Sequence, residues 1–452
     1  MKIHILGICG TFMGGIALLA RALGHEVSGS DSNIYPPMST QLEETGIKLQ
    51  QGYRAASLQP APDLVIVGNV VSRGNPCVEY MLDQGLRYFS GPQWLSEQVL
   101  ADKHVLAVSG THGKTTTTSL LAWILESAGK KPGFLIGGVA ENFGVSACLG
   151  NSRYFVVEAD EYDTAFFDKR SKFIHYHPRT LIINNIEFDH ADIFHDLADI
   201  KREFHRLIRT VPAAGQILHR HGDAEILDML AQGCWTPCQT FGIHSGDWHL
   251  TDNSGNFSAF DVNFGDHRVG SANWDLIGRH NGENALAAIA AAHHVGISPD
   301  SACAALNTFK SVKRRLELLA EVAGISIYDD FAHHPTAITA TLTALRASAP
   351  GTGRIIAVFE PRSNTMKLGV HRDALEAALA PADKVLIYQP RDLSWDLSAS
   401  LSGLGTKCEI YQETGTIIES VRKQAQAGDQ VVIMSNGDFD GIHRRLIEAL
   451  AR

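Results

Sequence analysis

Short apolar runs that end in glycine or polar residues recur along this chain of 452 residues. The first run, residues 3–6, enters a glycine-rich turn that is followed by a helical pattern at residues 16–23. A strand from Glu26 to Asp31 completes a strand–helix–strand unit, and another apolar strand follows at residues 64–67. Such units place helices on both faces of a mostly parallel sheet, so the pattern predicts an α/β fold.

The same pattern starts again near residue 102, which predicts a domain boundary there. Between about residues 215 and 275 the chain is richer in Gly, Asn, Asp and Ser and alternates more, which indicates shorter strands and loops. Elsewhere in this segment the pattern predicts strands at residues 105–108, 154–157 and 180–183 and helices at residues 115–128 and 281–294.

A third α/β segment begins near Arg314. Its apolar runs predict strands at residues 326–328, 355–359, 384–387 and 430–434, with helices between them. The predicted organisation is therefore three α/β domains, at residues 1–101, 102–313 and 314–452.

Composition narrows the class of protein. The formal net charge is −10 and no basic run is present, which argues against nucleic-acid binding. No apolar run approaches the roughly 20 residues that a membrane-spanning helix needs. The N-terminus lacks the pattern of a signal peptide, and seven scattered cysteines indicate reduced thiols. We therefore expect a cytoplasmic protein that binds neither membrane nor nucleic acid.

The strongest motif is a glycine-containing loop between a predicted strand and a predicted helix. It resembles a phosphate-binding loop, although Val108 stands where the first glycine of the standard spacing would be. Backbone N–H groups, a lysine and the helix N-terminus suit ATP phosphates, whereas the simpler interpretation is a glycine turn before a helix. The predicted ATP-binding residues of the loop are Gly110, Thr111, His112, Gly113, Lys114, Thr115 and Thr116.

Two strand ends next to this loop carry candidate metal ligands. Glu158 follows the apolar run at residues 154–157, and His190 follows Asp189 beyond the next strand. Carboxylate and hydroxyl oxygens are the ligands that Mg²⁺ prefers, so Thr115 and Glu158 are predicted to hold a magnesium ion, with His190 at a second ion. The alternatives are a solvated loop for Glu158 and a structural role for His190.

Further candidates lie near the second predicted boundary. Asn281 and Asn284 open a helix and are predicted to contact ATP, although Asn281 could simply cap the helix. Arg314 and Arg315 form an exposed basic patch in the simpler interpretation, and they stabilise a triphosphate in the functional one.

Two motifs in the third segment point to a second substrate. Asp330, His333 and His334 combine acids and histidines in a way that suits proton transfer from a reacting amine, while a histidine-rich helix start is the alternative. After the strand at residues 355–359 come three polar residues that suit recognition of a carboxylate: Arg362, Ser363 and Asn364.

These motifs, in this order and across nearly the whole chain, resemble the Mur ligase family. The resemblance implies a Rossmann-like UDP-binding domain, a central P-loop ATPase domain and a C-terminal Rossmann-like domain that binds the peptide substrate. It also implies that the N-terminal turn and two further positions bind a UDP-sugar: Gly7, Gly10, Met13, Gly14, Gly15, Asp31 and Ser72.

Within the family, the run from Gly68 to Pro76 and the run from Glu360 to Met366 are similar to the branch that acts in peptidoglycan recycling. That branch joins UDP-N-acetylmuramate to the tripeptide L-alanyl-γ-D-glutamyl-meso-diaminopimelate. The alternatives are UDP-N-acetylmuramate–L-alanine ligase and a non-catalytic sensor of UDP-muramyl compounds gated by nucleotide. A folylpolyglutamate synthase has no use for the glycine-rich UDP domain.

The resemblance implies a carbon–nitrogen ligase that uses ATP and two Mg²⁺ ions and forms an acyl phosphate. The residues implied to act in catalysis are Lys114, His190, Arg315, Asp330, His333 and His334. Some family members carry a carbamylated lysine at the second metal. No lysine falls at that position here, and Glu203 is the nearby carboxylate that could replace it. We expect a monomer or a weak homo-oligomer.

Overall fold

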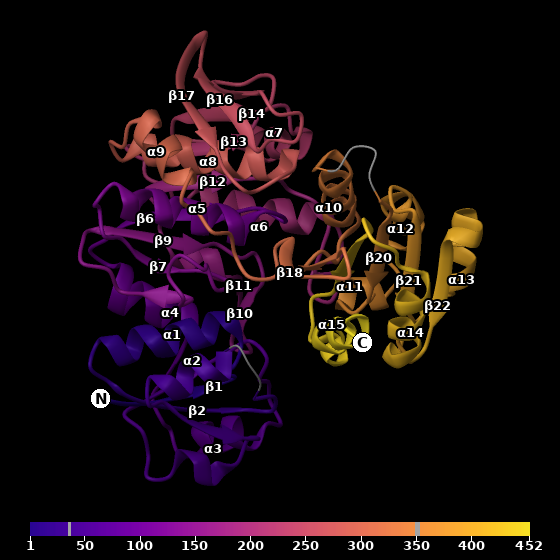
Figure 1. The fold of residues 1–452 in the computed structure, drawn as a ribbon. Coiled ribbons are helices and arrows are strands. Elements are labelled where there is room, and N and C mark those ends of the chain that lie inside the picture. Colours follow the sequence, from indigo (N-terminus) through magenta and orange to yellow (C-terminus); the bar gives the residue numbers. More distant parts are fainter. Residues whose placement is uncertain (35–37, 349–352) are drawn as a thin grey trace.

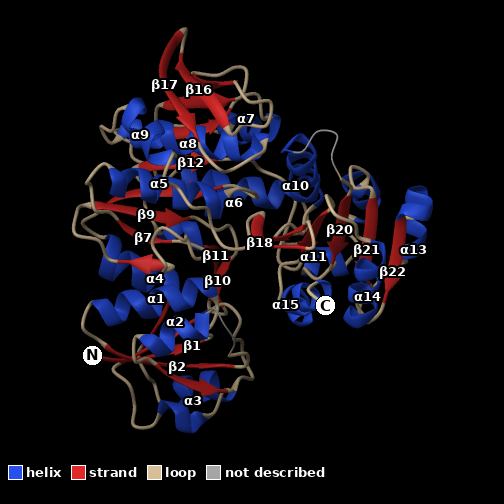
Figure 2. Ribbon diagram, viewed as in Figure 1, coloured by secondary structure: helices blue, strands red, loops and turns tan. Residues whose placement is uncertain are grey.

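The computed structural model describes residues 1–34, 38–348 and 353–452. Three large sheets, each with its own helices, succeed one another along the described chain (Figures 1 and 2). We call them the N-terminal unit (β1 to α4), the central unit (β6 to α9) and the C-terminal unit (β18 to α15). In Figure 1 the central unit stands above the N-terminal unit, and the C-terminal unit lies to one side. No helix in the described ranges combines the length and apolar character needed to cross a bilayer.

The N-terminal unit is a five-stranded parallel sheet in the order β3-β2-β1-β4-β5. Leu6 of β1 is in register with Ser30 of β2 and Val67 of β4, so the turns that follow these strands share one edge. The strands are β1 (Lys2–Leu6), β2 (Glu26–Asp31), β3 (Lys48–Gln51), β4 (Leu64–Val67) and β5 (Tyr88–Ser90). The helices are α1 (Thr11–Ala22), α2 (Met38–Glu44), α3 (Pro76–Asp83) and α4 (Gly91–Leu95).

The central unit is built on a ten-stranded sheet in the order β17-β16-β15-β14-β13-β12-β6-β9-β7-β8, beside a separate hairpin of β10 and β11. The strands are β6 (His104–Ser109), β7 (Gly133–Leu135), β8 (Ala147–Cys148), β9 (Tyr154–Glu158), β10 (Asp163–Ala165), β11 (Asp168–Ser171), β12 (Thr180–Ile183), β13 (Gln216–Arg220), β14 (Cys238–Gly242), β15 (Trp248–Asp252), β16 (Ala259–Phe264) and β17 (His267–Asn273). The helices are α5 (Lys114–Ser127), α6 (Leu197–Ile208), α7 (Ala224–Ala231), α8 (Arg279–His294) and α9 (Pro299–Leu306).

Register brings three loops of the central unit together. Val108 of β6 pairs with Glu158 of β9, and Ser109 pairs with Ile183 of β12. Because these strands are parallel, their carboxyl ends lie at one edge of the sheet, where ligands of open α/β sheets bind. The loops after β6, β9 and β12 therefore converge there.

The C-terminal unit has a six-stranded sheet in the order β18-β19-β23-β20-β21-β22, in which only β18 is antiparallel. Met434 of β23 is in register with both Asp330 and Phe359, so the loops after these three strands also meet. The strands are β18 (Glu317–Val322), β19 (Ile325–Asp330), β20 (Ile355–Phe359), β21 (Lys384–Tyr388), β22 (Cys408–Tyr411) and β23 (Gln430–Met434). The helices are α10 (Pro335–Ser348), α11 (Asn364–Lys367), α12 (Arg372–Leu379), α13 (Leu397–Ser400), α14 (Thr414–Gln424) and α15 (Ile442–Leu450).

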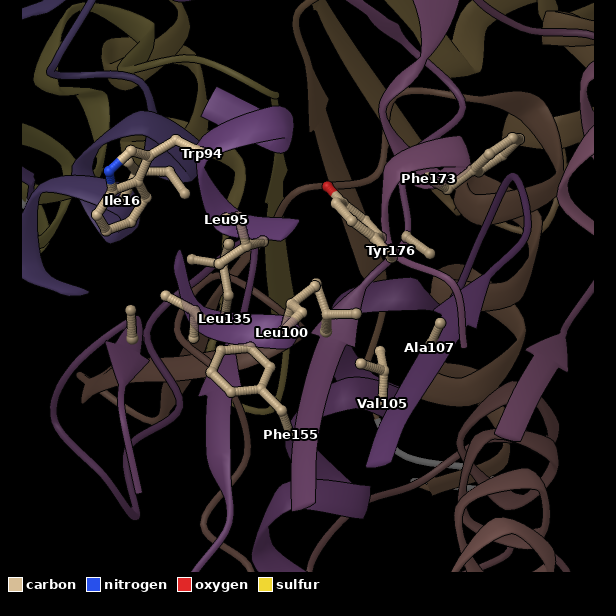
Figure 3. Packing of buried hydrophobic residues seen from close by; sticks show 14 of the residues in the cluster. Ile16, Trp94, Leu95, Leu100, Val105, Ala107, Leu135, Phe155, Phe173 and Tyr176 are labelled. Atoms are coloured by element: carbon tan, nitrogen blue, oxygen red, sulfur yellow. The ribbon is translucent and has the colours of Figure 1, made fainter. Parts of the chain in front are cut away.

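One apolar core joins the N-terminal and central units. Ile16 of α1 and Trp94 of α4 belong to the same buried cluster as Leu135 and Phe155 of the central sheet (Figure 3). Helix α1 lies so close that a Cβ on Gly15 would come within 2.2 Å of Leu135 Cδ1. The C-terminal unit has apolar clusters of its own, so it is bound to the rest of the molecule by other means.

Candidate active site

The phosphate-like loop connects β6 to α5 and depends on its glycines. Gly110 and Gly113 have φ angles of 130° and 79°, and a Cβ on Gly113 would lie 2.4 Å from Asn284 Oδ1. Asn185 holds the loop, since its Oδ1 accepts a hydrogen bond of 2.8 Å from the His112 backbone N–H. The loop is thus fixed with the N-terminus of α5 facing the space above the sheet.

Lys114 lies partly buried among carboxylates at the carboxyl end of β9. Its Nζ lies 2.9 Å from Glu161 Oε2 and 3.8 Å from Asp160 Oδ1. Burial by itself would lower the pKa of Lys114, but the attraction of Glu161 and Asp160 is larger in sum and raises it. The ammonium is therefore charged and ready to meet phosphate oxygens.

Thr115 and Glu158 form a compact oxygen pair next to the loop. Thr115 Oγ1 donates to Glu158 Oε1 at 3.1 Å, and the Gly137 N–H donates to Glu158 Oε2 at 2.7 Å. Burial raises the pKa of Glu158, because the nearby cations and the Gly137 N–H do not fully offset the cost of burying its negative charge. A buried hydroxyl and a partly buried carboxylate at this spacing fit a hard divalent cation.

His190 extends this acidic cluster. Its Nε2 lies 3.4 Å from Glu161 Oε1, and His190, Asp160 and Glu161 each offer one ligand atom within 4.8 Å of the others. Burial would lower the pKa of His190, but Glu161 and Asp189 raise it above its usual value. The sequence interpretation singled out Glu158 in this segment and missed that Asp160 and Glu161, two and three residues later, bind Lys114 and His190.

Asn281 and Asn284 reach the loop from α8. Thr117 Oγ1 donates to Asn284 Oδ1 at 3.1 Å, and both asparagines line the cavity described below. Helix α8 begins at Arg279 with Gly278 at its N-cap, so the alternative role of Asn281 as the capping residue is wrong. Asn281 Nδ2 instead donates back to Ile277 O at 2.8 Å.

The two neighbouring arginines have different partners. Arg315 is partly buried and crosses to the central unit, where its Nη2 donates to Thr115 Oγ1 at 3.1 Å. Arg314 stays within the C-terminal unit, pairing with Asp329 at 3.2 Å and donating to the carbonyl oxygen of Gly437 at 2.7 Å. Arg315 therefore reaches the phosphate loop, while Arg314 braces the chain beside it.

The acid and histidines after β19 lie on the facing wall. The two oxygens of Asp330 accept backbone hydrogen bonds from Leu316 and Ala332, each of 2.7 Å. Burial raises the pKa of Asp330 to about 6. His333 lies 4.0 Å from Asp189 across the boundary between the units, and burial lowers the pKa of His333.

His334 meets a carboxylate of the central unit. Its Nδ1 lies 3.6 Å from Glu187 Oε2, and His112 Nε2 lies 3.4 Å from the same oxygen. Burial, and then the nearby His112, lower the pKa of His334 to about 3. Both His333 and His334 are therefore neutral near pH 7.

These groups surround one cavity of about 1560 Å³ between the central and C-terminal units. A smaller cavity of about 290 Å³ adjoins it at the N-terminal glycine turn. The predicted residues that line the larger cavity are Thr111, His112, Gly113, Lys114, Thr115, Thr116, Glu158, His190, Asn281, Asn284, Arg314, Arg315, Asp330, His333 and His334. The predicted residues that line the smaller one are Gly7, Gly10, Met13 and Glu158.

The other residues predicted to bind the UDP-sugar lie outside both cavities. Gly14 and Gly15 are packing positions, since a Cβ on Gly14 would come within 2.2 Å of Met38 Sδ. Asp31 is buried at the end of β2 and accepts a hydrogen bond of 2.8 Å from the Cys9 N–H, so it holds the glycine turn. Ser72 is exposed.

The three residues expected to bind the peptide are absent from the lining of the larger cavity, although the Arg362 guanidinium lies against Gly437, which lines it. Arg362 is exposed, Ser363 Oγ caps α11, and Asn364 Nδ2 donates to Asp192 of the central unit at 3.1 Å. Glu203 is also outside both cavities. Its Oε2 accepts a hydrogen bond of 3.2 Å from Ser171 Oγ, which gives it a partner other than a metal.

Sequence profiles of protein-family domains match all three units. The profile of the Mur ligase family catalytic domain matches residues 2–103, that of the Mur ligase middle domain matches residues 108–292, and that of the Mur ligase glutamate ligase domain matches residues 314–437.

Full-length relatives agree with these matches. The chain is 54% identical over 452 residues to the UDP-N-acetylmuramate–L-alanyl-γ-D-glutamyl-meso-2,6-diaminoheptandioate ligase of Escherichia coli, covering 100% of this chain and 99% of that protein. It is 33% identical to the UDP-N-acetylmuramate–L-alanine ligase of Rubrobacter xylanophilus over 100% of both. The crystal structure of a murein peptide ligase from Psychrobacter arcticus is similar, with 50% identity, a TM-score of 0.78 and coverage of 100% and 99%.

Proposed function

Since this chain belongs to the Mur ligase family, we propose that it joins UDP-N-acetylmuramate to L-alanyl-γ-D-glutamyl-meso-diaminopimelate, using ATP. The observation that carries this proposal is the 54% identity, over the whole chain, to a relative named for that reaction. Relatives named for the addition of L-alanine reach 33%. The run from Glu360 to Met366, which is similar to the tripeptide branch, supports the same choice.

The proposed division of labour follows the three units. Residues 1–101 bind the UDP-sugar through the turn after β1, residues 102–313 bind ATP, and residues 314–452 bind the peptide. The two adjoining cavities support this division, because one opens at the N-terminal glycine turn and the other at the phosphate loop.

ATP is bound by the loop from Gly110 to Thr116, with Lys114 turning from Glu161 toward the β- and γ-phosphates. Asn281 and Asn284 approach from α8. Two Mg²⁺ ions are proposed, one held by Thr115 and Glu158 and one by His190 with its acidic neighbours. When bound, the ions neutralise phosphate charge and so favour attack by an anionic carboxylate.

The reaction has two balanced steps. A carboxylate oxygen of UDP-N-acetylmuramate forms a bond to the γ-phosphorus, and the bond to ADP breaks. The peptide amine then attacks the acyl carbon, releasing phosphate and a proton. Arg315 stabilises the transferred phosphoryl group from the junction of the units. We propose that Asp330, His333 or His334 accepts the proton.

A substrate panel tests the proposal. Phosphate release is measured with ATP, Mg²⁺ and UDP-N-acetylmuramate in the presence of either the tripeptide or L-alanine. We expect release that depends on the tripeptide. Release with L-alanine alone would identify the L-alanine ligase, and binding of both nucleotides without release under any condition would identify a sensor.

A variant tests the proposed peptide residues. Arg362→Ala removes an exposed guanidinium next to the larger cavity, so we expect the KM for the tripeptide to rise about 10-fold while the KM for ATP is unchanged. Arg391→Ala, at a side chain that is 92% exposed in the same unit, is the matched control. Equal behaviour of the two variants would contradict the assignment.

A further inference from the structure

The two cavities share four lining residues, so a ligand can extend from one cavity into the other. The shared residues are Thr11, Gly137, Glu158 and Asp160. If the UDP-sugar lies at the N-terminal glycine turn and ATP at Lys114, the reacting carboxylate has to pass this junction. Two of the four shared residues are acids, and they repel an approaching carboxylate.

Lys172 stands at this junction, directly after β11. It lines the smaller cavity, and its Nζ lies 2.8 Å from Asp160 Oδ2. Its side chain is 11% exposed, although lysine is rarely buried to this extent. Of the described residues that line the smaller cavity, it is the only lysine or arginine.

The ammonium of Lys172 has hydrogen-bonding capacity left over. It carries three N–H donors, and within the described ranges Asp160 is its one hydrogen-bond acceptor. Its other close neighbours are aromatic: Nζ lies 5.7 Å from the ring centre of Phe12 and 5.4 Å from that of Tyr162. Ring faces attract the cation but do not replace strong acceptors. A buried ammonium with spare donors fits an anionic ligand.

Phe12 ties this cation to the sugar side of the site. It belongs to α1, directly follows Thr11 and also lines the smaller cavity. Lys114 and Arg315, the other cations close by, line the larger cavity and contact the phosphate loop or its acidic neighbours. Lys172 is therefore the cation that an acid attached to the UDP-sugar meets first.

We propose that Lys172 binds the carboxylate of the UDP-sugar substrate and so selects UDP-N-acetylmuramate over UDP-N-acetylglucosamine, which lacks that carboxylate. The proposal rests on the proposed function. A charge-assisted hydrogen bond in a buried site offsets the repulsion from Glu158 and Asp160 and holds the carboxylate on its way to the γ-phosphate. Lys172 then acts in specificity, separately from the phosphate-binding lysine.

The test compares two ligands and two proteins. Dissociation constants for UDP-N-acetylmuramate and UDP-N-acetylglucosamine are measured by calorimetry, with Mg²⁺ and a non-hydrolysable ATP analogue present, for the wild type and Lys172→Met. Methionine retains the length of the side chain and its packing on the rings. We expect the variant to lose about 10- to 100-fold in affinity for UDP-N-acetylmuramate and less than about 3-fold for UDP-N-acetylglucosamine.

Lys169→Met is the matched control, because this lysine lies on β11, three residues before Lys172, and its side chain is 70% exposed. It should leave both affinities unchanged. Equal losses for the two sugars in Lys172→Met would mean that Lys172 only positions Asp160, and no loss for either would mean that it contacts neither ligand. Each result would overturn the proposal.

A second variant keeps the proposal testable if Lys172→Met does not fold. Lys172→Gln keeps one hydrogen-bond donor for Asp160 but removes the charge, so the same selective loss is expected. The proposed function is tested separately by phosphate release from the wild type. If the wild type binds both sugars but releases no phosphate with the tripeptide, the proposed function fails while the preference for the carboxylate can still be measured.

Discussion

Lys114 shows how a single residue prepares the site before nucleotide binds. Its ammonium is neutralised by Glu161 and Asp160, which spares the buried site an unpaired charge. We expect the same carboxylates to be released for His190 and a divalent ion once phosphate oxygens engage the lysine. In the proposed mechanism, one cation thus serves both the empty and the occupied site.

Lys114→Ala should abolish turnover and spare the sugar site. Loss of this charge removes its attraction for the γ-phosphate, and we expect kcat for phosphate release to fall by at least about 10²–10³-fold. The affinity for UDP-N-acetylmuramate, measured by calorimetry, should stay within about 3-fold of the wild type, a difference of about 0.7 kcal/mol. A collapse of UDP-sugar binding in this variant would contradict the separation of the two sites.

The raised pKa of Asp330 predicts that the activity depends on pH. Burial raises its pKa to about 6, so its carboxylate becomes protonated as the pH falls through 6 and can then no longer accept a proton or attract Arg315. We expect kcat/KM for the tripeptide to fall on the acidic side of about pH 6. His334→Gln should leave this limb in place, since the pKa of His334 is about 3. A limb that disappears in His334→Gln and remains in Asp330→Asn would reverse the assignment.

At the scale of elements, the loop between β6 and α5 is fixed by backbone conformation as much as by side chains. Gly113→Ala meets two penalties: a φ of 79° and a contact of 2.4 Å with Asn284 Oδ1. We expect a loss of about 2–4 kcal/mol in the free energy of unfolding and a KM for ATP raised at least about 10-fold, because α8 is pushed away from the loop.

A second glycine separates the two penalties. Gly129, just past α5, has a φ of 71° and open space where a Cβ would stand, so Gly129→Ala meets only the backbone strain. It should lose about 1 kcal/mol and leave ATP use unchanged. Urea unfolding and steady-state kinetics measure both effects. Equal losses of stability in the two variants would show that Asn284 is not crowded.

The elements that the sequence predicts are those whose apolar runs are long enough to carry a pattern. Each predicted strand is present, including β6, β9 and β12 with the loops that form the site. Several of the missed strands are short or polar: β3 reads Lys-Leu-Gln-Gln, and β7 has three residues. Strands of this kind are stabilised by their neighbours in the sheet, which the local sequence does not reveal.

The same limit applies to the site. The loop, Glu158, His190 and Arg315 could be found because each lies in a local motif. Lys172 could not. Its contact with Asp160 depends on how the β10–β11 hairpin folds back, and its contact with Phe12 on how the chain after that hairpin lies against the N-terminal unit. The different roles of the adjacent arginines also depend on which unit each one reaches. Tertiary packing decides both.

At the scale of the whole molecule, the two junctions differ in kind. The N-terminal and central units share one apolar core, whereas the C-terminal unit meets the central unit through polar contacts around the larger cavity. These contacts include Arg315 with Thr115, Thr336 with Glu187 and Asn364 with Asp192. Polar junctions of this kind open at low cost, so the C-terminal unit is the one expected to move during substrate entry and product release.

Thr365 tests this difference between the junctions. Its buried hydroxyl donates to Asp189 Oδ1 at 2.8 Å and accepts from the Ala191 N–H at 3.3 Å, joining α11 to the central unit. Thr365→Val keeps the shape of the side chain but removes both hydrogen bonds. This should destabilise the arrangement in which the C-terminal unit contacts the central unit by about 1–3 kcal/mol. We expect a larger radius of gyration by X-ray scattering with substrates bound, and a lower kcat.

Thr416→Val is the control, since Thr416 is exposed on α14 away from this junction. Its radius of gyration and its kcat should equal those of the wild type. The affinity of Thr365→Val for UDP-N-acetylmuramate in the absence of peptide should also be unchanged, because the core between the N-terminal and central units is untouched. A variant that loses UDP-sugar binding yet scatters like the wild type would place the flexible junction at the other boundary, against the apolar core seen there.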